Sequence, residues 1–313
     1  MTLSVKDLKV QYKSRDRTVR AVDGVSFLLE NNESIGIVGE SACGKSTLGL
    51  AIIRSASGGE IVSGDILLDD TSMLKMSEDE FAKTILWKKI SMVFQGAMNS
   101  LDPVFSIKEQ FEEVLKNHRH EGDRIKIINE AIDAVGLSPS ILGKFPHELS
   151  GGMKQRVVIA MALLLKPRLV IADEPTTALD VLVQAQILGL LKKLKKGGMS
   201  FVLISHDLGI ISEIADKVGI MYAGKIVEFG TLQEVYSAPK HPYTQALLKS
   251  MPKIKGEQDL ISLKGNPPSL ITPPKGCRFY DRCVHAKEKC REEPPVIKTE
   301  TGYVSCWLYE ETK

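Results

Sequence analysis

The sequence predicts an α/β fold built around a mainly parallel sheet. Short apolar runs typical of buried strands alternate along the chain with amphipathic segments typical of helices. One such unit is the run SIGIVG, which ends in glycine and leads through a glycine-rich turn into a helical segment at 45–54. Another is RLVIADE, which precedes the amphipathic segment VLVQAQILGLLKKLKK. Strands that alternate with helices in this way favour parallel pairing.

The remaining elements follow from local patterns. LSVKDLKVQY alternates and VRAVDGVSFLLE is rich in valine, so both predict strands near the start of the chain. DILLDD and ISMVFQ predict two more strands. From about 107 to 165, apolar residues recur three and four positions apart, which indicates helices. We then expect a strand at FVLISH, a helix at DLGIISEIADK and a hairpin at VGIMYAGKIVEFG, with Ala223 and Gly224 at its turn.

The composition changes toward the C-terminus. Nine of the 14 prolines follow Ser237, which predicts a separate, loop-rich extension. We therefore expect one domain at 1–235, with a helical subdomain at about 98–165, and a C-terminal extension at 236–313.

Composition and charge exclude several classes of protein. The 41 basic residues nearly balance the 39 acidic ones, whereas nucleic-acid-binding domains usually carry a basic excess. Hydrophobic residues make up 43% of the chain, which argues against disorder. The longest apolar run, Val157 to Leu165, is far short of the ~20 residues that span a bilayer. The N-terminus lacks the layout of a secretory signal, so we expect a cytosolic protein that does not bind nucleic acid.

The strongest motif is GESACGKST, which fits G-x-x-x-x-G-K-[ST] between a predicted strand and a predicted helix. Gly39 and Gly44 permit a tight loop whose backbone N–H groups wrap a phosphate chain. Lys45 is suited to neutralising phosphate charge and Ser46 to offering its hydroxyl to Mg²⁺. We interpret Cys43 as a small residue that the loop tolerates, in preference to a redox switch. The predicted binding residues of this loop are Gly39, Ser41, Cys43, Gly44, Lys45, Ser46 and Thr47.

Two acids at the end of the strand LVIADE are predicted to complete the phosphate site. Asp173 is suited to holding Mg²⁺, directly or through water. Glu174 is suited to orienting or deprotonating an attacking water. Taken alone, the pair could be a solvated strand end before a helix cap. Together with the phosphate loop, it predicts a nucleotide-hydrolysing site.

Between these two motifs stands LSGGMKQR, at 149–156, and together they resemble the motifs of ATP-binding-cassette (ABC) ATPases. Gln95 resembles the family's Q-loop glutamine, Ala178-Leu179-Asp180 its D-loop and His206 its switch histidine. Tyr12 stands where the family places an aromatic that stacks on adenine, and an ordinary strand aromatic is the alternative. The order and spacing agree over roughly residues 1–235.

The resemblance implies a P-loop NTPase core with an antiparallel β subdomain and a helical subdomain. It also implies a dimer that holds two ATP molecules between its subunits, with the SGG segment of one subunit binding the γ-phosphate on the other. It assigns catalytic roles to Lys45, Gln95, Glu174 and His206. It also assigns nucleotide binding to seven further residues, which are Tyr12, Gln95, Ser150, Gly151, Gly152, Asp173 and Asp180. It assigns Mg²⁺ binding to Ser46, Gln95 and Asp173.

Further strings resemble the ATPases of dipeptide/oligopeptide importers. They are QGAMNSLDPVFSI, IADEPTTALDVLVQAQIL, HPYTQALL and GNPPSLITPPKGCRFYDRCVHAKEKC, so the resemblance covers nearly the whole chain. It implies docking on two membrane permease subunits at the cytoplasmic side of the cell membrane. It also implies an external substrate-binding protein and a second, related ATPase subunit. Met98, Asn99 and Leu101 are candidates for the permease contact, with a plain surface loop as the alternative.

The expected function is therefore ATP hydrolysis that energises the import of di- or oligopeptides. Importers of this type also carry oligosaccharides, nickel chelates or glutathione, and the ATPase does not touch the solute, so these alternatives stay open. A soluble ABC ATPase of translation or DNA repair is the alternative from another class. The single P-loop, the single signature and the lack of a sustained heptad run argue against it.

Four of the five cysteines lie in the last 37 residues. Clustered cysteines in a reducing compartment favour metal or cofactor ligation over disulfides. Their gaps of five, six and fifteen residues differ from the short paired spacing of structural zinc, and four thiolates match the ligand count of an iron–sulfur cluster. Similar tails in the resembled family carry a [4Fe–4S] cluster, which implies that cluster here; zinc, free thiols or disulfides are the alternatives. The predicted ligands are Cys277, Cys283, Cys290 and Cys306.

Overall fold

The computed structural model describes residues 1–250 and 265–310. By contacts it divides into two compact units. The first unit comprises Met1–Leu74 and Ile204–Lys313, and the second comprises Lys75–Leu203. The domain boundary expected near residue 235 was inferred from a change in composition, whereas these units are defined by contacts. That boundary stays a prediction.

Among its described residues, the first unit holds two groups of strands and four short α-helices. Its elements are β1 (Leu3–Ser14), β2 (Arg17–Leu29), β3 (Ser34–Val38), α1 (Lys45–Ile52), β4 (Gly59–Leu68), β5 (Thr71–Ser72), α7 (Leu208–Ser212), β9 (Lys217–Tyr222), β10 (Lys225–Thr231), α8 (Leu232–Ser237), α9 (Pro242–Lys249), β11 (Val296–Lys298) and β12 (Tyr303–Ser305). The antiparallel sheet β2-β1-β4-β5 confirms the strands expected from the first residues of the chain.

The other strands of the first unit lie in the order β11-β12-β10-β9-β3. β3 pairs with β9 in parallel, whereas β9, β10, β12 and β11 pair antiparallel. The predicted hairpin is confirmed, because β9 and β10 are joined at Ala223 and Gly224, whose φ angles are 45° and 87°. A tight hairpin turn with two positive φ angles matches the right-handed twist of its strands.

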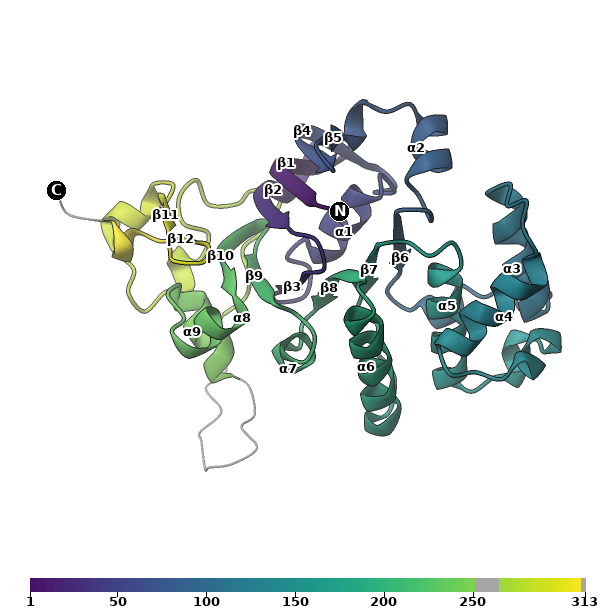
Figure 1. Ribbon diagram of the computed structural model, residues 1–313. Coiled ribbons are helices and arrows are strands. Elements are labelled where there is room, and N and C mark those ends of the chain that lie inside the picture. The colour runs from purple at the N-terminus through teal and green to yellow at the C-terminus, as the bar shows by residue number, and fades with distance from the viewer. Residues whose placement is uncertain (251–264, 311–313) are drawn as a thin grey trace. The chain divides into compact units, whose positions relative to one another are not determined.

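The C-terminal extension contributes two strands that the sequence did not predict. β12 lies beside β10 (Figure 1). Glu228 is opposite Val304 and Phe229 is opposite Tyr303. The rings of Phe229 and Tyr303 stack with centroids 5.7 Å apart. The described residues of the extension therefore lie in the same compact unit as the strand β3 and the loop after it.

The second unit combines three strands with the helices of the region 98–165. Its elements are α2 (Glu78–Thr84), β6 (Ile90–Val93), α3 (Ile107–Asn117), α4 (Arg124–Ala134), α5 (Gly151–Leu163), β7 (Leu169–Asp173), α6 (Val181–Lys196) and β8 (Ser200–Ser205), the last two residues of β8 belonging by contacts to the first unit. The strand order is β8-β7-β6, and β6 pairs with β7 in parallel. The predicted α/β class is thus confirmed.

One helix is shorter than predicted. The pattern DLGIISEIADK indicated a helix across the whole segment, but α7 ends at Ser212. Four residues later Asp216 is tied to β3, since its N–H donates to Ser34 O at 2.8 Å and its Oδ2 accepts from Ser34 N–H at 2.8 Å. These two bonds turn the chain into β9 before the helix can continue. Among the described residues, no helix is long and apolar enough to cross a membrane.

Candidate active site

The loop between β3 and α1 lies tight against its neighbours. A Cβ on Gly39 would fall 2.0 Å from the carbonyl oxygen of Met221, at the end of β9. Gly44 has a φ of 107°, and a Cβ there would fall 2.0 Å from Ala21 O in β2. Glycine is therefore required at both positions by contacts with distant strands, as well as by the turn itself.

Lys45 lies inside the curve of this loop. Its side chain is buried, with the residue 6% exposed. The ammonium Nζ donates to Gly39 O at 2.8 Å and to Glu40 O at 2.9 Å. Two backbone carbonyls thus hold a positive charge beside a loop of backbone N–H donors, which is the arrangement a polyphosphate chain requires.

The first unit also brings Tyr12 to this loop. Its hydroxyl lies 3.4 Å from Thr47 Oγ1. Gly59, in β4, places no side chain against the ring, and a Cβ there would lie 3.0 Å from it. Ser41 is exposed and Ser46 half-buried, so both are accessible from solvent. Cys43 is 2% exposed, and burial raises the pKa of its thiol.

In the second unit, the end of β7 joins three further candidates. Asp173 is 2% exposed. Glu174 follows with a φ of 48°, and its Oε2 accepts hydrogen bonds from Gln95 Nε2 at 3.1 Å and from the Thr177 hydroxyl at 2.9 Å. Gln95 and Glu174, predicted from separate motifs, therefore meet. Thr177 was not predicted, although it stands in the quoted string IADEPTTALD.

The signature and D-loop residues of the second unit begin two helices. Ser150 is the N-cap of α5, and its hydroxyl accepts from Met153 N–H at 3.3 Å. Asp180 is the N-cap of α6, and its Oδ1 accepts from Val183 N–H at 2.9 Å. A Cβ on Gly152 would lie 2.7 Å from Val183 Cγ1, so a glycine here lets the two helix starts approach closely.

The remaining candidates differ in exposure. His206 follows β8 and is exposed. Asn99 is exposed and Met98 half-buried, whereas Leu101 is 6% exposed and packs inside the second unit. Of the three residues expected to contact a permease, only Met98 and Asn99 present area to a partner.

The four cysteines of the extension surround one small cavity, together with His241 and Phe279. All four of these cysteines are free thiols. Burial, followed by the charges of the neighbouring thiols, raises the pKa of Cys277 to about 12. The kind and number of donors fit an iron–sulfur site. Nevertheless, no group of three or more His, Cys, Asp or Glu side chains in the described residues is arranged so that it could hold a metal ion.

Comparisons with known proteins agree with this geometry. The profile of the family described as "ABC transporter" matches residues 22–177, and that of "Oligopeptide/dipeptide transporter, C-terminal region" matches residues 227–290. The oligopeptide transport ATP-binding protein AppD of Bacillus subtilis is 44% identical over 99% of this chain and 97% of its own length. The chain belongs to the ABC transporter family. It is an ABC-type ATPase, as the resemblance implied.

Other members of the ABC transporter family support the same assignment. The dipeptide transport ATP-binding protein DppD of Caldanaerobacter subterraneus is 41% identical over 99% of this chain and 97% of its own length. The structure titled "Dimeric structure of a post-hydrolysis state of the ATP-binding cassette MJ0796 bound to ADP and Pi" is similar with a TM-score of 0.65 and 27% identity. The match covers 74% of this chain and 98% of the chain in that structure. The expected ABC ATPase fold is confirmed.

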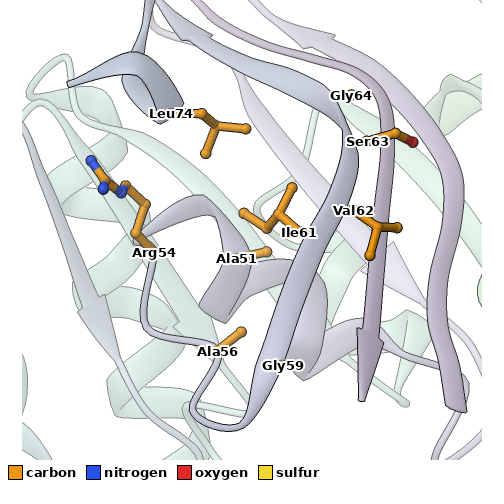
Figure 2. A pocket seen from close by; sticks show the side chains of 9 residues that line it. All are labelled: Ala51, Arg54, Ala56, Gly59, Ile61, Val62, Ser63, Gly64 and Leu74. Atoms are coloured by element: carbon orange, nitrogen blue, oxygen red, sulfur yellow. The ribbon is translucent and has the colours of Figure 1, made fainter. Parts of the chain in front are cut away.

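This ABC ATPase has another pocket that contains none of the predicted site residues. It lies between the end of α1 and β4, where Ala51, Arg54 and Ile61 line it together with Leu74 (Figure 2). Arg54 has a φ of 56° and donates through Nη1 to Met73 O at 3.1 Å. The arginine therefore has a structural contact at the rim of this pocket.

Glu40 in the phosphate loop of this ABC ATPase, and Tyr243 and Arg282 beside it, were not predicted from the sequence. Glu40 is one of the unspecified positions of the motif, and its carboxylate pairs with Arg282 at 2.7 Å. Its N–H donates to the Tyr243 hydroxyl at 3.0 Å. Tyr243 stands in the quoted segment HPYTQALL, so this segment was the available signal. Nothing around Arg282, which precedes Cys283, pointed to the loop.

Proposed function

We propose that this chain is the ATP-hydrolysing subunit that energises a binding-protein-dependent ABC importer of di- or oligopeptides. The hydrogen bond between Gln95 and Glu174 beside Asp173 carries the hydrolytic part of this proposal. The match of residues 227–290 to the C-terminal region of oligopeptide/dipeptide transporters supports the importer part. The names of the relatives AppD and DppD support peptides as the solute.

In this proposal the phosphate loop and Lys45 bind the phosphates of ATP. Lys45 neutralises charge on the β- and γ-phosphates. Ser46, Gln95 and Asp173 would hold Mg²⁺, which would supply further neutralisation of phosphate charge. Glu174 accepts a proton from the attacking water, and Gln95 and Thr177 orient its carboxylate. His206 is the fourth proposed catalytic residue, as the switch histidine. Tyr12 stacks on the adenine.

The signature and D-loop residues are assigned to the second ATP of a dimer. Ser150 begins the 13-residue helix α5, whose N-terminus carries partial positive charge and N–H donors. Ser150, Gly151 and Gly152 would therefore bind the γ-phosphate held by the other subunit, with Asp180 at the same interface. The remaining loop contacts are those of Gly39, Ser41, Cys43, Gly44 and Thr47.

The proposed assembly places this chain at the cytoplasmic side of the cell membrane. Its partners are a second, homologous ATPase subunit and two permease subunits, with an external binding protein that delivers the solute. Met98 and Asn99 would contact a permease. A pull-down with the tagged chain from solubilised membranes should recover two permeases, and ligand screening on the binding protein of the same system should retain peptides. If the binding protein retains oligosaccharides or nickel chelates instead, the proposed peptide solute is wrong. Recovery of ribosomal or DNA-repair proteins would overturn the importer proposal.

The nucleotide assignment is tested by Lys45→Ala. Because Lys45 is the ammonium group inside the loop, its removal should weaken ATP binding on the order of a hundredfold. Calorimetric titration with ATP measures this, and Lys249→Ala, at the end of α9, is the control. Unchanged ATP affinity in Lys45→Ala would contradict the assignment.

We further propose that Cys277, Cys283, Cys290 and Cys306 hold a [4Fe–4S] cluster. Four thiols around one cavity support it, as does the proline-rich extension, which has little core of its own and would gain stability from a metal centre. Protein purified without oxygen should be brown and contain about four iron atoms per chain. Cys43→Ser should keep the iron and Cys283→Ser should lose it. Colourless protein that contains zinc, or no metal, would refute the cluster.

A further inference from the structure

Glu40, the second residue of the phosphate loop, has three separate polar contacts. Its carboxylate pairs with Arg282, its N–H donates to the Tyr243 hydroxyl at 3.0 Å, and its carbonyl oxygen accepts from Lys45 Nζ at 2.9 Å. Two of these partners come from the C-terminal part of the chain, 203 and 242 residues away. All four residues lie in the first unit.

The contact between Arg282 and Glu40 is a bidentate ion pair. Nη1 donates to Oε2 at 2.7 Å and Nη2 donates to Oε1 at 2.8 Å, and Nη1 also donates to the Tyr222 hydroxyl at 3.1 Å. The arginine side chain is 6% exposed and the glutamate side chain 23% exposed. A planar, bidentate and largely buried pair of this kind fixes the position of the carboxylate, and removing one partner leaves the other charge poorly compensated.

Tyr243 fixes the backbone of the same residue. The tyrosine is fully buried, and its ring packs 4.5 Å from that of Tyr222 and 5.4 Å from that of Phe279, measured between centroids. Phe279 comes from the cysteine-containing segment. The hydroxyl that receives the Glu40 N–H is therefore held by a rigid aromatic cluster.

A second contact joins the extension to the other side of the loop. Arg278 donates to Ala223 O in the β9–β10 turn and pairs with Asp23. The next residue of that turn, Gly224, donates its N–H to Cys43 O at 2.8 Å. The extension thus contacts the loop through Glu40 directly and through this turn indirectly.

We propose that Arg282 and Tyr243 are positioning residues for ATP binding, which act through Glu40 on Lys45 and the loop backbone. A loop held in its binding conformation loses less conformational entropy when the phosphates arrive, so the contacts raise affinity without touching ATP. The inference rests on the proposed nucleotide role of Gly39–Thr47. It does not depend on which metal the cysteines hold.

The first test compares Arg282→Ala with Arg291→Ala. Both arginines adjoin a cysteine of the extension, but Arg291 pairs with Glu288, three residues away, and lies over the Tyr280 ring. Arg282→Ala should raise the Kd and KM for ATP on the order of tenfold, with a smaller change in kcat, and Arg291→Ala should change neither. Arg282→Lys, which restores one charge and one donor, should recover part of the loss.

The second test asks whether the effect passes through Glu40. In a Glu40→Gln background, Arg282→Ala should have little further effect on Kd, because the pair is already weakened. Additive losses would overturn the route through Glu40. Should Arg282→Ala fail to fold by circular dichroism, Tyr243→Phe takes its place. It removes only the hydroxyl and should also raise the Kd, whereas Tyr309→Phe, which removes a hydroxyl bound to Lys240 O, should not.

The outcomes separate this inference from the proposed nucleotide site. If Lys45→Ala lowers ATP affinity but Arg282→Ala and Tyr243→Phe both leave it unchanged in folded protein, the positioning role is refuted and the site stands. If Lys45→Ala also leaves ATP affinity unchanged, the proposed site itself is refuted.

Discussion

Gln95 donates a hydrogen bond through Nε2 to Oε2 of Glu174 at 3.1 Å. The two residues are 79 positions apart and come from the ends of the paired strands β6 and β7. The Thr177 hydroxyl donates to the same oxygen at 2.9 Å. Two neutral donors therefore fix a carboxylate without neutralising it, which leaves Glu174 able to accept a proton from water.

Glu174→Gln should permit ATP binding and nearly stop hydrolysis, by about a hundredfold or more, because the amide cannot accept the proton. Steady-state phosphate release measures turnover, and gel filtration with ATP should show a trapped dimer. Glu113→Gln, an exposed change on α3, is the matched control. Near-normal turnover in Glu174→Gln would remove this residue from the role of base.

Tyr12→Ala should raise the KM for ATP about tenfold and leave kcat nearly unchanged, since stacking on a base contributes to binding and not to the chemical step. Tyr12→Phe should bind ATP almost normally, because the contact of its hydroxyl with Thr47 is long, at 3.4 Å. Initial-rate kinetics with ATP distinguish the two variants. Equal KM values in Tyr12→Ala and the parent would indicate an ordinary strand aromatic.

Ser106→Ala should destabilise the second unit by about 1 kcal/mol at neutral pH, because Ser106 forms a capping box with Glu109 at the start of α3. The hydrogen bonds from the Ser106 hydroxyl and backbone lower the pKa of the Glu109 carboxyl. A lowered folded pKa means that the part of this contribution made by the Glu109 carboxylate is present above the carboxyl's ordinary pKa and is lost as the pH falls through the lowered value. Thermal unfolding of both proteins should therefore differ less in acid than at neutral pH. A constant difference would contradict the role of the carboxylate.

Cys43 should react slowly with iodoacetamide at neutral pH in the folded protein. The residue is 2% exposed, and burial raises its pKa, so little thiolate is present and the reagent has poor access. Labelling should accelerate only above the usual pKa range of a thiol, and the urea-unfolded protein gives the reference rate. Mass spectrometry of the Cys43 peptide measures both rates. Equal rates in folded and unfolded protein would favour the redox switch instead of a tolerated small residue.

Local patterns predicted the parts of the site that depend on neighbours in the sequence. The strand–glycine–helix unit around Lys45 and the hairpin turn at Ala223 each require particular residue types within a few positions. The structure contains both. Gln95 and Glu174 were predicted separately, and the structure brings them together because both follow strands that pair in parallel.

Contacts between distant segments left no such pattern. The pair of Glu40 and Arg282 joins two ordinary surface residue types across 242 positions, and no periodicity or spacing predicts it. The early end of α7 depends on bonds between Asp216 and Ser34, which lie 182 positions apart. The short strands β11 and β12 have only three residues each. β12 forms against β10 and β11 against β12, so the proline-rich sequence around them indicated loops.

The pairing of β12 with β10 also covers part of a sheet edge. Without the extension, β10 would present its unpaired N–H and C=O groups, and such an edge is a template for aggregation. The extension covers that edge with a three-residue strand and ends the described sheet on that side with another, β11. Pro294 and Pro295 precede β11 and Lys298 ends it, so the new edge is short and charged. A short, charged edge of this kind is a poorer template for strand pairing than an uncovered β10 would be.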